Sequence, residues 1–86
     1  MISDLNKNNL VPFINDGDWL GDIANKVKNL VGLYESKEMP TEALVFMCGE
    51  MLKMTSATAT SDQILRKDEL NGVINAIVDE AKAQWV

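Results

Sequence analysis

The sequence predicts a small all-α domain, and three observations lead to this fold class. The hydrophobic fraction of 47% argues against disorder. Two segments, at about 18–35 and 68–85, place apolar residues at the i, i+3, i+4, i+7 spacing of a one-sided helix. Between them, residues 41–55 predict a third helix that is apolar around most of its circumference. We therefore predict one domain over residues 1–86, a small bundle of three main helices with an irregular N-terminal arm at 1–17.

The N-terminal arm is the least regular part of the sequence. Pro12 disfavours helical geometry before it, so any helix in the arm should end near Leu10. The arm nevertheless contains apolar residues, among them Phe13, and these predict packing against another surface. Two alternatives remain open: a lid over the protein's own core, or an arm that docks on a neighbouring subunit or partner.

The first main helix has a clear start and a clear apolar stripe. Asp16 or Asp18 supplies its N-cap. Its apolar residues cover an arc of about 140°; they are Trp19, Leu20, Ile23, Ala24, Val27, Leu30, Val31 and Tyr34. Gly21 and Gly32 fall on the polar side, where each costs about 1 kcal/mol relative to Ala. We interpret them as drift on a solvated face, with close approach of another backbone as the alternative.

The central helix carries the most unusual pattern. Its charged residues Glu42, Glu50 and Lys53 fall on one narrow strip with Gly49, and apolar residues cover an arc of roughly 200°. We therefore predict that this helix is covered on more than one side and lies between the other two. Phe46 also falls on the polar strip. Either another element covers it, or it is an exposed aromatic anchor of the kind that dominates interfaces.

The final helix has a stripe that changes character at its start. Extended backwards from Leu70, the apolar stripe falls on Arg66 and Lys67. We therefore predict a break near Lys67, with Asp68 capping the final helix and residues 64–65 forming a separate turn. Thr60 and Gln63 have the spacing of a capping box before that turn.

Trp85 stands close to the end of this sequence, where chains usually fray. Two roles remain open for it. It closes the stripe onto Trp19 or Tyr34, or it is a second interface anchor.

The residue inventory argues against catalysis and metal binding. The chain has no His and one Cys, which excludes Ser/His/Asp and Cys/His nucleophile pairs, His-based zinc sites and thiolate clusters. No glycine-rich phosphate loop is present. Asp16, Asp18 and Asp22 lack the order of a calcium loop, so we interpret them as capping residues. Cys48 faces the apolar arc and is expected to be a buried, inert thiol. We predict no enzyme activity, cofactor or metal.

The charge balance is acidic, with 13 Asp and Glu against eight Lys and Arg. Direct binding to nucleic-acid phosphates is disfavoured because it needs clustered cations. The start of the chain shows no signal-peptide pattern, and its apolar runs are too short to span a bilayer. We therefore expect a cytoplasmic protein without membrane or small-molecule partners.

One segment resembles a known class of proteins. Residues 33–43 read LYESKEMPTEA, a helix exit followed by a helix entry. This junction resembles those of short helical accessory proteins encoded by tailed phages. The resemblance implies a viral or mobile-element source, hence a host cytoplasm, and a role in binding partners.

These observations favour a non-catalytic protein–protein interaction module that binds or inhibits a host protein. One alternative is a structural subunit of a homo-oligomeric or virion assembly. A second is an acidic mimic of nucleic acid that blocks a basic groove. The candidate interface residues are Phe46, Glu42, Glu50, Lys53, Phe13 and Trp85.

Overall fold

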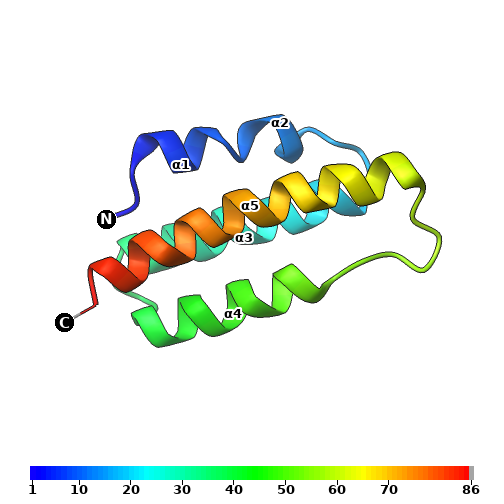
Figure 1. Ribbon diagram of the computed structural model, residues 1–86. Helices are drawn as coiled ribbons and strands as arrows, with labels where there is room; N and C mark the ends of the chain where they lie inside the picture. Colours follow the sequence, from blue (N-terminus) through cyan, green and yellow to red (C-terminus); the bar gives the residue numbers. More distant parts are fainter. Residues whose placement is uncertain (86) are drawn as a thin grey trace.

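The computed structural model describes residues 1–85, which form five helices and no strand (Figure 1). The helices are α1 (Asp4–Asn8), α2 (Val11–Ile14), α3 (Trp19–Glu35), α4 (Thr41–Lys53) and α5 (Ser61–Ala83). The predicted all-α class is confirmed. None of these helices combines the length and the apolar character that crossing a membrane requires.

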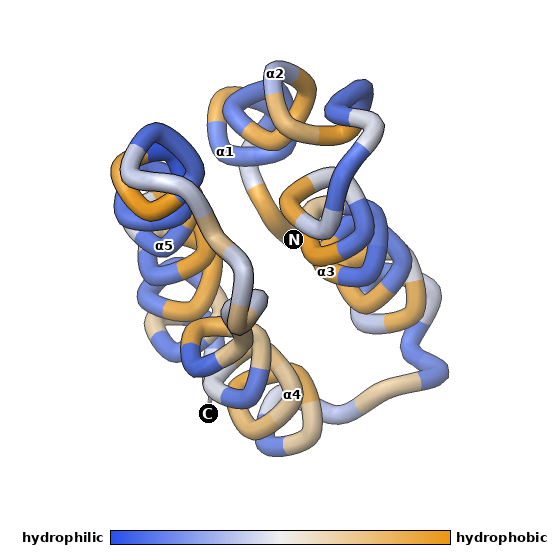
Figure 2. Tube along the Cα trace, turned by 90° about the vertical axis from the view of Figure 1, so that its right-hand side faces the viewer, coloured by the Kyte–Doolittle hydropathy of each residue, from blue (hydrophilic) through white to orange (hydrophobic). Residues whose placement is uncertain are grey.

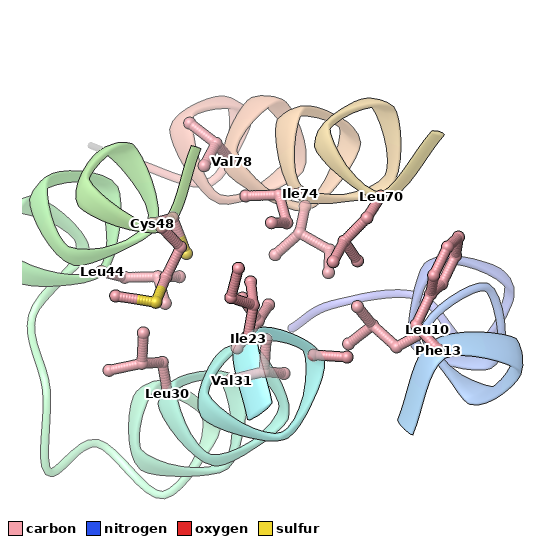
Figure 3. Close-up of a cluster of buried hydrophobic side chains, with 14 of the residues drawn as sticks. Leu10, Phe13, Ile23, Leu30, Val31, Leu44, Cys48, Leu70, Ile74 and Val78 are labelled. Carbon is pink, nitrogen blue, oxygen red and sulfur yellow. The ribbon is translucent and has the colours of Figure 1, made fainter. Parts of the chain in front are cut away.

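The helices surround one core from four sides. Figure 2 shows α3 and α5 facing each other, with α4 on one side of this pair and α1 and α2 on the other. The arm and α4 run antiparallel to α3 and α5 (Figure 1). All four sides contribute buried side chains, as Figure 3 shows. The core includes Leu10 and Phe13 of the arm, Ile23 and Val31 of α3, Leu44 and Cys48 of α4, and Leu70, Ile74 and Val78 of α5.

The N-terminal arm is more regular than predicted and packs on its own core. Ser3 caps α1 by accepting a hydrogen bond from the Asn6 amide, and α1 ends at Asn8, close to the expected limit before Pro12. Val11 nevertheless opens the short helix α2, because Pro12 stands in the first turn, where its missing N–H costs nothing. Ion pairing then fixes the arm: Lys7 Nζ lies 2.7 Å from Glu35 Oε1. Of the two alternatives, the lid over the core is the one observed.

Gly21 has a role that the sequence interpretation missed. It is buried, and a Cβ on it would lie 2.0 Å from the carbonyl oxygen of Asp16. The turn that joins α2 to α3 therefore needs a residue without a side chain at this position. Close backbone approach, the alternative explanation, is correct for Gly21. Gly32 has open space around its missing Cβ and needs no such explanation.

Helix α4 differs from the prediction in its surroundings. It ends at Lys53 and buries Leu44, Cys48 and Met51 on one side only. It packs against both α3 and α5, as predicted, but these two helices also contact each other, so α4 occupies one side of the pair (Figure 2). Its wide apolar arc is therefore only partly used within the described chain, and Met47 remains 38% exposed.

Helix α5 is continuous from Ser61, so the predicted break near Lys67 is wrong. The capping box of Thr60 and Gln63 starts the helix. Lys67 occupies the stripe and is only 5% exposed. Its Nζ donates to the Leu52 carbonyl oxygen at 3.0 Å and to Asn71 Oδ1 at 2.7 Å. The stripe tolerates this cation because the end of α4 supplies carbonyl groups that lack partners within their own helix.

Candidate functional site

The outer face of α4 is the clearest candidate surface, and we call it the Phe46 strip: Glu42, Phe46, Gly49, Glu50 and Lys53. Phe46 is 66% exposed and lies on the side of the helix opposite Leu44 and Cys48. A Cβ built on Gly49 would meet no atom of another element within 4 Å. Of the two alternatives for Phe46, exposure is the one observed within residues 1–85. Burying a Phe side chain is worth about 1.5–3 kcal/mol, so its exposure leaves that energy for a binding event.

The charges around Phe46 are weakly engaged within the chain. Lys53 Nζ lies 3.8 Å from Glu50 Oε1, and both side chains are at least half exposed. Exposed pairs of this kind contribute little to folding. Glu42 is exposed in the first turn of α4, and Lys53 is exposed in the last turn. Both ends of the strip therefore present charge that a partner can meet.

Phe13, proposed as an interface residue, is instead part of the core. It is 5% exposed, and the guanidinium of Arg66 lies 5.0 Å above its ring centroid. The same Arg66 donates to Asp16 Oδ2 at 2.7 Å. Phe13 thus anchors the arm to α5 and is removed from the candidate surface.

Trp85 is half exposed, and one of its predicted contacts is excluded by the fold. Trp19 opens α3 and Trp85 follows α5, and these helices run in the same direction, so the two side chains belong to opposite ends of the molecule (Figure 1). Tyr34 lies at the same end as Trp85, where its hydroxyl is 3.4 Å from Gln84 Oε1. Trp85 is therefore a half-exposed aromatic at the end of the molecule where Gln84 contacts Tyr34 and Met1.

Acidic residues gather in two clusters, Asp16, Asp18 and Asp22 and then Glu35, Glu38 and Glu42, and several of them serve the fold. Asp18 caps α3 by accepting from the Leu20 amide at 3.0 Å, and its other oxygen accepts from Gln63 Nε2 at 3.0 Å. Glu35 accepts from Lys7 and from the Ile2 amide. Burial raises the pKa of Glu35, but these two donors outweigh burial and hold the pKa below its ordinary value. Both carboxylates therefore serve structural roles.

The chemistry of the remaining groups is limited. Within residues 1–85, no cluster of three or more His, Cys, Asp or Glu side chains has the arrangement that holds a metal ion. Burial raises the pKa of Cys48 to about 11, so little of the reactive thiolate is present near neutral pH. A groove of about 600 Å³ lies at the junction of α3 and α4. Glu35 is the carboxylate in its lining, and its lowered pKa makes it a poor proton donor.

Ile64 and Leu65 are among the exposed apolar residues that were missed as surface candidates. Ile64 and Leu65 are 51% and 62% exposed on the first turns of α5. Their position off the apolar stripe indicates that they are exposed, but the predicted break near Lys67 assigned them to a separate turn.

Comparison with known proteins adds no relative: no family model, no curated protein and no solved structure matches this chain.

Proposed function

We propose that this protein is a non-catalytic protein–protein interaction domain, a small helical bundle that binds a partner through the Phe46 strip. One observation carries the proposal. Phe46, a large aromatic residue, is 66% exposed in the middle of a well-formed helix, although the chain buries its other Phe almost completely. Aromatic side chains of this kind are the usual energetic centres of protein interfaces. The charged residues around it provide the polar rim that such interfaces have.

The role implied by the phage-protein resemblance is that of an accessory protein in a host cytoplasm that binds or inhibits a host protein. A structural subunit whose copies bind one another is the second candidate. The strip has an acidic residue at one end, Glu42, and a basic residue at the other, Lys53, and this arrangement favours binding between two copies. The nucleic-acid mimic has less support. Asp16, Asp18 and Glu35, which belong to the acidic clusters, are used in contacts within the chain.

The test is the Phe46→Ala variant, with Leu65→Ala as a matched control that removes an equally exposed apolar residue from α5. Binding to a captured partner, or self-association, should weaken at least about tenfold for Phe46→Ala, since 1.4 kcal/mol is tenfold in affinity. The control should retain binding within about twofold. If Phe46→Ala binds every partner as well as the unmodified chain, the strip is not the interface and the proposal is wrong.

A further inference from the structure

The Phe46 strip has the spacing of a coiled-coil seam. Glu42, Phe46, Gly49 and Lys53 follow one another at steps of four, three and four residues, which is the alternation of a and d positions in a heptad. All four lie on the face of α4 that points away from the core. A second helix can therefore pack along this face in a regular way.

In an antiparallel pair of identical helices related by a two-fold axis, residues meet when their numbers have a constant sum. For this strip the sum of 95 pairs Glu42 with Lys53 of the other copy and Phe46 with Gly49 of the other copy. Each pair then occurs twice, because a two-fold interface presents the same patch on both sides. The end layers join opposite charges, and the middle layers place an aromatic ring over a residue without a side chain. A shift by one heptad would lose half of these layers, since α4 spans only Thr41–Lys53.

We infer that the occupant of the Phe46 strip is a second copy of this chain, packed antiparallel across α4 in a two-fold dimer. This inference rests on the proposed function and names its partner. The open space at Gly49, where a Cβ would meet no other element within 4 Å, receives the partner's ring. Val45 and Leu52 are half-buried along one flank of the strip and add apolar surface beside it.

The expected dimer is weak. Helix α4 is about 20 Å long at 1.5 Å per residue, and a single helix pair of that length falls below the ~800 Å² per partner of a standard interface. We expect a dissociation constant on the order of 10–100 µM. Sedimentation equilibrium from about 5 to 500 µM should show the mass rising from 9.5 kDa toward twice that value.

Charge reversal tests the register. Glu42→Lys alone and Lys53→Glu alone each place like charges opposite each other twice, and each should raise the dissociation constant at least about tenfold. The double variant restores opposite charges in both end layers and should return the constant to within about threefold. Glu42 in the first turn and Lys53 in the last turn of α4 both interact favourably with the helix dipole, and the double variant loses this stabilisation at both ends. Recovery of the dimer therefore cannot come from a more stable helix. Asp79→Lys, an exposed reversal on α5, is the matched control and should leave association unchanged.

Gly49→Gln gives a second test, in which weaker folding cannot explain a loss of the dimer. Gln is a better helix former than Gly and fits the open space, so the monomer should become more stable. The longer side chain fills the site of the partner's Phe46 ring, so the dissociation constant should rise at least about tenfold.

A chain that stays at 9.5 kDa throughout, or a double variant no better than the single ones, overturns the dimer. The proposed function then stands only if Phe46→Ala still weakens binding to a different protein. If Phe46→Ala also changes no binding, both proposals fail.

Discussion

The two sides of the molecule that flank the α3–α5 pair each carry a phenylalanine close to a glycine, but only one side buries these residues. On the arm side, Phe13 and Gly21 lie where the turn before α3 meets the bundle, and both are buried. On the other side, Phe46 and Gly49 lie on the outer face of α4, and Phe46 stays 66% exposed. An aromatic residue close to a glycine is thus satisfied within the chain in one place and left open in the other.

This difference separates structural irregularity from a candidate interface. Gly21 is required because the Asp16 carbonyl occupies the space of its Cβ, and Phe13 is held under Arg66. Both residues are thus explained by a contact within the chain. Phe46 and Gly49 have no neighbouring element of the described chain on this face, and this is the observation behind the proposed interface.

Replacing each Phe by Ala should give the largest contrast in stability. Phe13→Ala empties a buried site and removes the ring under Arg66, so we expect a loss of about 3 kcal/mol. Phe46→Ala removes an exposed ring and should change the unfolding free energy by less than about 0.5 kcal/mol. Urea denaturation at low protein concentration, where the chain is monomeric, measures both values. Similar losses for the two variants would show that the outer face of α4 is covered within the chain.

Replacing each glycine by Ala should change the free energy of unfolding in opposite directions. Gly21→Ala forces a Cβ to within 2.0 Å of backbone that cannot move without shifting the α2–α3 turn, and we expect a loss of about 2–3 kcal/mol. Gly49→Ala meets open space and should gain up to about 1 kcal/mol from helix propensity. Thermal unfolding of the two variants beside the unmodified chain gives the comparison. A stabilising Gly21→Ala would mean that the turn packs more loosely than the structure shows.

The fold class and the long helices could be predicted because apolar periodicity depends only on local sequence. The position of α4 could not, because the same wide arc suits a helix covered on two sides and a helix with one outer face. Helix α2 was missed because Pro12 stands in its first turn, where the usual restriction on the residue before proline does not hold. The docking of the arm was left open because it depends on distant contacts, such as Lys7 with Glu35. Of the candidate residues, Phe46 was identifiable as an apolar residue on a polar strip. Phe13 was misassigned because its cover, Arg66, lies far along the chain.

Lys67 is the reverse of Phe46, a charged residue on an apolar stripe, and its predicted loss is smaller than those for Phe13 and Gly21. Lys67→Met keeps most of the side-chain volume but removes the donor to the Leu52 carbonyl and to Asn71. Leaving these acceptors without their donor should cost about 1–2 kcal/mol at neutral pH. The exposed Lys82→Met is the matched control and should cost less than about 0.5 kcal/mol.

The pH dependence measures how strongly burial penalises the charged form of Lys67. Burial lowers the pKa of Lys67 below its ordinary value of 10.5. In the pH window just below 10.5, the unfolded chain therefore binds more protons at this residue than the folded chain does. Stability from this group consequently rises with pH through that window. The free energy of unfolding of the unmodified protein should rise relative to that of Lys67→Met as the pH approaches 10.5 in chemical denaturation. A difference that stays flat with pH would mean that the ammonium group of Lys67 remains solvated in the folded protein.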